Sequence, residues 1–117
     1  MPLKDELQAL SDIYVAAYRK GDASGCAAVF TPDGILYSAF APVAVGRAAI
    51  AQLHVAWTAD GMDKTLTVVE AKGVGDVAWA RASFAEGNAT EEGHALSACI
   101  RVPGGPWQIK VCSLTAA

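Results

Sequence analysis

The sequence has little positive charge and no long apolar run. It contains 9 Lys and Arg against 12 Asp and Glu, which gives a formal net charge of −3, and it has no basic cluster. Nucleic-acid binding needs a positive surface that neutralises phosphates, so this class is excluded. The longest apolar region, residues 39–57, is interrupted by Pro42, Gly46 and Arg47. No segment reaches the ~20 apolar residues that cross a bilayer, and we expect no membrane partner.

Cysteine is scarce and irregularly placed. The three cysteines, Cys26, Cys99 and Cys112, are odd in number and show no Cys-X-X-Cys spacing. This pattern favours small, reduced, apolar side chains in an intracellular protein. The first residues carry Asp5 and Glu6 and lack the apolar centre of an export signal, so we expect a cytoplasmic location.

Histidine is equally scarce. The two histidines, His54 and His94, have no short spacing of the kind that metal ligands show, and we predict no metal. Gly73-Val74-Gly75 lacks the surrounding pattern of a nucleotide-binding loop. We therefore expect no cofactor.

The composition that is present suits a globular chain. Hydrophobic residues make up 53% of the 117 residues and charged residues 18%, which excludes a disordered protein. The length predicts a single domain over residues 1–117. Alanine supplies much of the apolar share, so the core contains few bulky side chains and dimerisation would add burial.

Apolar spacing predicts helices in the first half of the chain. One face of an amphipathic helix recurs at spacings of 4, 3, 4 and 3, at Leu3, Leu7, Leu10, Tyr14 and Ala17. Gly21 suits the end of this helix, and Asp22 suits the N-cap of a second helix through Phe30. A third helix is predicted over Arg47–Ala59, with one face formed by Ile50, Leu53, His54 and Trp57.

The second half of the chain shows the period of strands. After the turn Pro32-Asp33-Gly34 and a strand over Ile35–Phe40, four more strands are predicted over Thr65–Val74, Val77–Glu86, His94–Val102 and Trp107–Thr115. If Pro103–Pro106 forms the last hairpin loop, Ala98 faces Val111, and Leu96 and His94 fall on the same, mostly apolar face. We take this face as the core side. Helices followed by an antiparallel sheet indicate an α+β fold.

The order of these elements resembles that of a known family. The segments that carry the resemblance are YVAAYRKGD (Tyr14–Asp22), GCAAVF (Gly25–Phe30), TPDGILYSAF (Thr31–Phe40), VGRAAI (Val45–Ile50) and the closing GGPWQI. Together they resemble the NTF2-like superfamily, in particular its SnoaL-like and DUF4440 groups and the ketosteroid isomerases. The resemblance implies a cystatin-like cone, in which three N-terminal helices pack on a curved mixed or antiparallel sheet around an apolar cavity. It also implies a homodimer formed through the outer face of the sheet.

The resemblance also indicates which chemistry is missing. Tyr14 aligns with the oxyanion-hole tyrosine of the ketosteroid isomerases, which use it together with an Asp base and a protonated Asp. The position of the base falls on Ser38, and that of the protonated acid falls on Ala98. A serine hydroxyl is not basic enough to act as the base, and an alanine cannot donate the hydrogen bond of the protonated acid. Steroid isomerisation is therefore excluded.

Three residues are candidates for catalysis. Tyr14 would act as a donor, and His54 or His94 would carry a proton. The alternatives are a tyrosine that packs in the core and two histidines on the surface. The side chains expected to line the ligand cavity are Tyr14, Ser38, His54, Trp57, Phe84, Ala98, Val111 and Ser113.

The functional hypothesis follows from these residues and from the resemblance. We expect a protein that binds a small apolar organic molecule, with cofactor-free acid–base catalysis of an isomerase, dehydratase or cyclase type. The alternative is a non-catalytic module that binds a ligand or only dimerises. Trp79 and Arg81 share one face of their strand, and in a homodimer they would suit the interface.

Overall fold

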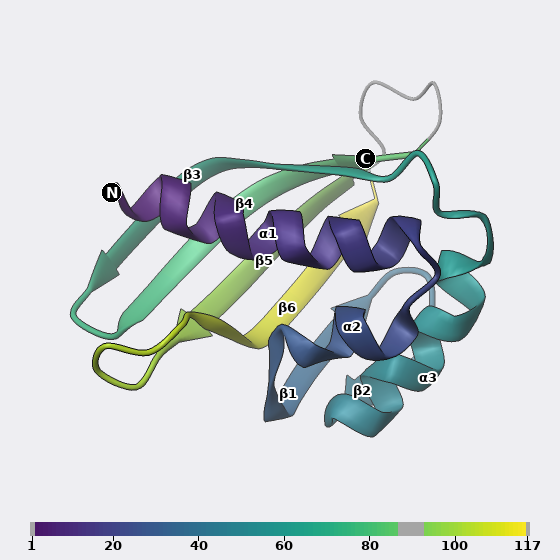
Figure 1. The fold of residues 1–117 in the computed structure, drawn as a ribbon, viewed down its shortest axis with the longest axis horizontal. Helices are drawn as coiled ribbons and strands as arrows, with labels where there is room; N and C mark the ends of the chain where they lie inside the picture. The colour runs from purple at the N-terminus through teal and green to yellow at the C-terminus, as the bar shows by residue number, and fades with distance from the viewer. Residues whose placement is uncertain (1, 87–92, 117) are drawn as a thin grey trace.

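The computed structural model describes residues 2–86 and 93–116, and it shows helices packed on one face of a mixed six-stranded sheet (Figure 1). In chain order the elements are α1 (Leu3–Arg19), α2 (Ala23–Ala28), β1 (Phe30–Ser38), β2 (Ala44–Val45), α3 (Arg47–Trp57), a 3₁₀ turn (Thr58–Asp60), β3 (Thr65–Val74), β4 (Val77–Ala85), β5 (Gly93–Ile100) and β6 (Gln108–Ala116). The strand order is β2-β1-β6-β5-β4-β3, and among the described strands only the β1–β6 pair is parallel. The predicted α+β architecture is confirmed.

The end of α1 and the start of α2 follow from local chemistry as predicted, whereas α2 ends at Ala28 and not at Phe30, which begins β1. The chain leaves α1 through Gly21, whose φ of 73° is a left-handed conformation that favours glycine. Asp22 then caps α2, because its carboxylate accepts a hydrogen bond from the Gly25 N–H at 2.9 Å. Within the described ranges, no helix is both long and apolar enough to cross a bilayer.

The register of the last hairpin is confirmed over most of its length. His94 pairs with Thr115 and Ala98 pairs with Val111, as the hairpin loop predicted. A bulge after Ala98 then shifts the register, so Ile100 pairs with Gln108. Because a bulge bends its strand and increases its twist, it helps curve the sheet around the helices.

One local prediction was wrong, and one short strand was missed. Pro32-Asp33-Gly34 does not precede the first strand but lies inside β1, where the pairing with β6 is irregular between Phe30 and Ile35. The short strand β2 was not predicted, because its two residues are too few to show a period. It extends the sheet beyond β1 and leads through Gly46 into α3.

The choice of core face was also wrong, although the register was right. Ala95, Cys99 and Cys112 are buried and face the helices, whereas Leu96 is 54% exposed and lies on the other side of the sheet. We call the face beneath α1 the inner face and the opposite one the outer face. Successive side chains of a strand point to opposite faces. Choosing the wrong face for one residue, which we call a parity error, therefore misplaces every residue of that strand.

Side chains of α1 satisfy the free edge of β3. The Gln8 amide donates to the Leu66 carbonyl at 3.1 Å and accepts from the Val68 N–H at 2.7 Å, as a neighbouring strand would. Arg19 donates to the Lys64 carbonyl at 2.8 Å. An unpaired edge would otherwise offer a template for aggregation. These bonds also fix α1 above the inner face, where the candidate site lies.

Candidate functional site

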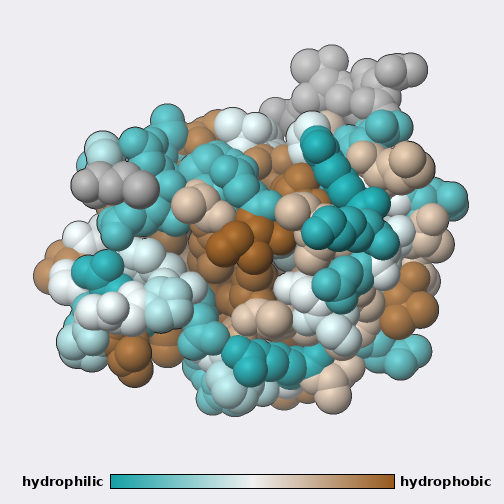
Figure 2. Space-filling view, viewed as in Figure 1, coloured by the Kyte–Doolittle hydropathy of each residue, from teal (hydrophilic) through white to brown (hydrophobic). Residues whose placement is uncertain are grey.

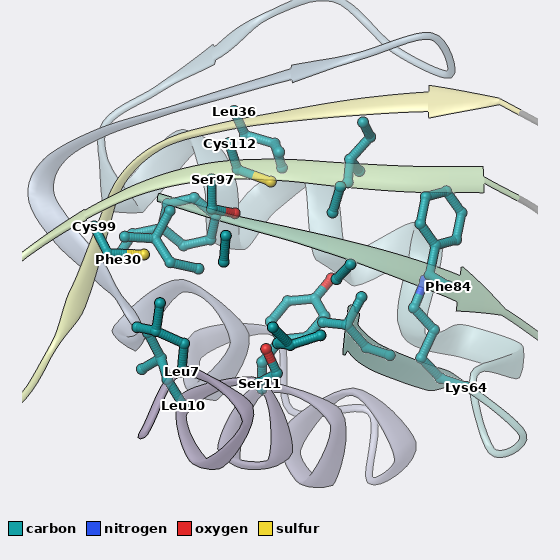
Figure 3. Close-up of a pocket in the computed structure, with 18 of the residues that line it drawn as sticks. Leu7, Leu10, Ser11, Phe30, Leu36, Lys64, Phe84, Ser97, Cys99 and Cys112 are labelled. Carbon is teal, nitrogen blue, oxygen red and sulfur yellow. The ribbon is translucent and has the colours of Figure 1, made fainter. Parts of the chain in front are cut away.

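A cavity of about 60 Å³ lies between α1 and the inner face. In space-filling view it is a hollow floored by hydrophobic side chains near the middle of the molecule (Figure 2). Leu7, Leu10 and Ser11 of α1 face Leu36, Ser97 and Cys112 of the sheet across it (Figure 3). The remaining lining is mostly aliphatic and includes Phe30, Leu66, Val68, Ala80, Ala82, Ala95, Ile109 and Leu114. Such a wall excludes water and favours an apolar ligand.

Tyr14 and His54 both line this cavity and contact each other there. The Tyr14 hydroxyl oxygen lies 2.8 Å from His54 Nε2, although the two residues are 40 positions apart in the sequence. The rings meet edge to face at 5.5 Å. His54 is 0% exposed, so α3 delivers this imidazole completely into the interior. The predicted candidates Tyr14 and His54 are thus brought together.

The direction of this hydrogen bond follows from the other ring nitrogen. His54 Nδ1 lies 2.8 Å from the Ile50 carbonyl oxygen, one turn earlier on α3. A carbonyl oxygen can only accept, so Nδ1 carries the proton. In the neutral ring Nε2 is then an acceptor, and the Tyr14 hydroxyl donates to it.

Burial keeps both groups uncharged. Loss of hydration lowers the pKa of His54 below its ordinary 6.5; the Ile50 bond opposes this change and the nearby Lys64 ammonium adds to it. Burial likewise raises the pKa of Tyr14 well above 10, with smaller contributions from neighbouring thiols, Tyr18 and Glu86. Near neutral pH the pair is therefore a phenol that donates to a neutral imidazole.

A charged cluster that the sequence did not reveal borders the cavity. Lys64 lines the wall and is 7% exposed, with Nζ 3.5 Å from a Glu86 carboxylate oxygen. The ammonium also lies 4.5 Å from the Phe84 ring centroid and 4.6 Å from that of Tyr18. The Tyr18 hydroxyl donates to the same Glu86 oxygen at 2.8 Å. These contacts let a cation remain in a largely apolar wall.

The sequence carried a signal for only part of this cluster. Tyr18 follows Tyr14 by one helical turn, so helical spacing alone places the two side chains together on α1. Lys64 lies between the 3₁₀ turn and β3, outside any periodic element. Its burial depends on Glu86 and Phe84, which are distant in the sequence.

Comparison with known proteins gives the family. A model of the SnoaL-like domain matches residues 12–115. The chain belongs to the SnoaL-like family. This confirms the resemblance to the NTF2-like superfamily. No curated protein matches the sequence.

Solved structures agree with this SnoaL-like assignment at the level of the fold. A ketosteroid isomerase-like protein from Erwinia carotovora atroseptica has a TM-score of 0.76 and 21% identity over 97% of this chain and 95% of that one. An NTF2-like protein with a cystatin-like fold from Novosphingobium aromaticivorans has a TM-score of 0.73 and 24% identity over 96% of this chain and 80% of that one. At these identities the similarity establishes the cystatin-like fold alone.

Of three further residues predicted to line the cavity, one does so and two do not. Phe84 lines it as predicted. Trp57 packs against the His54 ring at 5.0 Å and does not line the cavity itself. The Ser38 hydroxyl accepts a hydrogen bond from the Phe40 N–H at 2.8 Å, in the turn after β1, and is not in the cavity wall.

The last four predicted residues lie on the wrong face for this cavity. Ala98, Val111 and Ser113 share the outer face, as does His94, which pairs with Ser83 and Thr115. The prediction that they line the cavity is therefore corrected, and the cause is the parity error in β5 and β6. The positions that do line it on these strands are Ala95, Ser97, Cys99, Ile109, Cys112 and Leu114.

The two thiols in the cavity wall, Cys99 and Cys112, stay protonated and are therefore poor nucleophiles. Burial raises the pKa of Cys99 to about 12 and that of Cys112 to about 11, and each stays protonated near neutral pH. All three cysteines are buried and free. Within residues 2–86 and 93–116, no group of three or more His, Cys, Asp or Glu is arranged to hold a metal ion.

Proposed function

We propose that this SnoaL-like protein binds a small, largely apolar organic molecule in the inner cavity and that Tyr14 and His54 provide acid–base chemistry there without a cofactor. The observation that carries the proposal is the 2.8 Å contact between the Tyr14 hydroxyl and His54 Nε2 within a largely apolar wall. A buried polar pair is costly to place in such a wall unless it is satisfied. A perturbed histidine and tyrosine in a cavity are typical of a functional site.

The geometry supports a proton relay that begins at the ligand. An acidic hydroxyl or carbon-bound hydrogen of the ligand transfers its proton to Tyr14 Oη, while the Tyr14 hydroxyl proton moves to His54 Nε2. The ligand becomes an anion and His54 becomes an imidazolium, whose Nδ1–H still donates to the Ile50 carbonyl. Reversal of the relay at a different ligand atom completes an isomerisation, a dehydration or a cyclisation.

Steroid isomerisation by the known pair of acids does not fit this proposal. The described part of the cavity wall contains no Asp or Glu. Ser38 is engaged in a turn and Ala98 faces outward, so neither position supplies a base or a protonated acid.

The lack of Asp and Glu in the described cavity wall also supports the alternative function, a module that binds a ligand without converting it. The cavity is also small compared with the ~150 Å³ hollow that is known to hold benzene in another protein. A ligand would have few atoms or would protrude from the hollow.

The proposal includes a homodimer formed through the outer face. Trp79, Leu96 and Ile100 are 39%, 54% and 37% exposed there, and Arg81 lies beside them on β4. An exposed apolar face of this kind, which includes a Trp and an Arg, suits a protein interface. The three free thiols favour a reducing compartment, so we place the dimer in the cytoplasm.

A two-part titration tests the proposal. Small cyclic alcohols, phenols and ketones are added to labelled protein in D₂O, and both amide shifts and deuterium uptake at ligand carbon are followed by NMR. Shifts around the inner face with uptake that requires His54 support catalysis. The same shifts without uptake support the binding module. Shifts confined to the outer face, or none with any compound, contradict both.

A further inference from the structure

The Tyr14 hydroxyl has already used its only proton. The Ile50 carbonyl fixes the proton of His54 on Nδ1, at 2.8 Å, and leaves Nε2 as the acceptor of the Tyr14 O–H, also at 2.8 Å. His54 is the only hydrogen-bond partner of this hydroxyl among the described residues. What the tyrosine can still offer a ligand is the lone pairs on its oxygen.

The opposite arrangement is costly at both ends of the imidazole. A proton on Nε2 would leave the Nδ1 lone pair facing the Ile50 carbonyl oxygen at 2.8 Å, with two acceptors opposed in a fully buried position. Ile50 itself is 0% exposed, so no solvent relieves this contact. The backbone of α3 therefore determines which way the tyrosine donates.

The other polar groups in the wall do not replace this selectivity. Lys64 is held by Glu86 at 3.5 Å and by two aromatic faces. Ser11 and Ser97 line the cavity with rotatable hydroxyls, which can donate or accept and so do not discriminate. Discrimination between ligands falls to the Tyr14 oxygen.

We propose that the cavity selects molecules that present a hydrogen-bond donor to Tyr14 Oη, so that its ligands are small apolar alcohols, phenols or enols in preference to ketones or ethers of the same shape. This inference rests on the proposed function, since it names the ligand class for the same cavity. It reverses the role that the resemblance implied for Tyr14, in which the tyrosine donates to a ligand oxygen.

The first test needs no ligand. Long-range proton–nitrogen NMR on the labelled protein at neutral pH identifies which ring nitrogen of His54 is protonated. The inference predicts a protonated Nδ1 and an unprotonated Nε2, with the Tyr14 hydroxyl proton coupled to the latter. An unprotonated Nδ1 overturns the inference, whether or not any molecule binds.

The second test uses cyclopentanol and cyclopentanone, which share a carbon skeleton and differ in donor ability. We expect the alcohol to bind about tenfold more tightly to the unmodified protein, because the ketone places one acceptor against another. Tyr14→Phe should remove that advantage by weakening the alcohol alone. Tyr37→Phe, on the exposed outer side of β1, is the matched control and should change neither affinity.

A third variant should reduce the preference for the alcohol by strengthening the binding of the ketone. In His54→Leu the Tyr14 hydroxyl loses its acceptor and can turn its proton to the cavity, so cyclopentanone should bind several-fold more tightly than before. If this variant does not fold, the Tyr14→Phe comparison and the nitrogen spectra still decide the matter. Equal affinities for both probes in every variant contradict the ligand class but leave the proposed cavity in place. Failure of both probes to bind contradicts the proposed function, while the nitrogen spectra still test the inference.

Discussion

Along the middle of β4 and β5, the two faces of the sheet differ in the size of their side chains more than in their polarity. The inner face of β4 and β5 carries the small residues Ala80, Ala82 and Ala95, which are buried and leave room for a cavity. The outer face of the same strands carries Trp79 and Leu96, which are large and exposed. On these two strands the large residues Trp79 and Leu96 mark the face available to a partner, whereas the three alanines leave room for a hollow that bulkier side chains of other strands, such as Leu36, enclose.

The largest effect should come from removing a bulky inner residue. Leu36 is 2% exposed on the inner side of β1, so Leu36→Ala should lower the free energy of unfolding by about 2–5 kcal/mol. Leu96→Ala is the matched change on the outer face, at 54% exposure, and should stay within about 0.5 kcal/mol at low protein concentration. Chemical denaturation measures both, and equal losses would remove the distinction between the faces.

A smaller loss should follow when a buried charge is removed. Lys64→Met leaves the Glu86 carboxylate without its cation, and because Glu86 is about one-third exposed we expect a loss of about 1–3 kcal/mol. Lys72, exposed and paired with Trp79 across β3 and β4, is the control, and Lys72→Met should change the stability little. If both variants unfold at the same denaturant concentration, the Lys64 cluster contributes nothing to stability.

The faces should also separate in an association experiment. Leu96→Lys places a charge in the outer apolar patch, and we expect it to weaken dimerisation at least tenfold, or by about 1.4 kcal/mol, without altering the fold. Sedimentation over a range of concentrations measures this. A mass that stays at 12.1 kDa for the unmodified protein at high concentration would refute the homodimer itself.

Much of the fold could be predicted because its signals are local. Gly21 and Asp22 define a helix end and a helix start, and the hairpin loop at Pro103–Pro106 sets the register that pairs Ala98 with Val111. The inner face could not be predicted by apolarity, since the more apolar face of β5 is the outer one. Only the packing of α1 over Ala95 and Cys99 decides which parity encloses the cavity.

The site was predictable to a similar extent. Tyr14 and His54 each lie on the apolar face of a helix, so helical spacing made both of them candidates for the cavity, although a surface position for His54 stayed open. Their mutual contact did not follow from spacing, because it depends on how α1 and α3 are placed by the sheet. Lys64 was missed because it follows Asp60-Gly61 and Asp63, a sequence typical of an exposed loop, and a lysine in such a loop is usually on the surface.

The smallest effect should appear in the pH dependence of stability. Since folding lowers the pKa of His54 below 6.5, the unfolded chain binds more protons as the pH falls past 6.5, and stability decreases there before it levels off below the folded pKa. Tyr14 and the thiols have raised pKa values, so stability should also decrease as the pH rises above about 9. Denaturation across this range checks both limbs, and His54→Leu should flatten the acid limb. An unchanged acid limb in that variant would show that His54 is not responsible for it.

We expect ligands to bind in the inner cavity at Tyr14 and not on the outer face. A crystal structure of the protein soaked with cyclopentanol tests it most directly. We expect density in the cavity with the alcohol oxygen within hydrogen-bonding distance of Tyr14 Oη. Density that occurs only on the outer face beside Leu96 and Trp79, with the cavity unchanged, would contradict it.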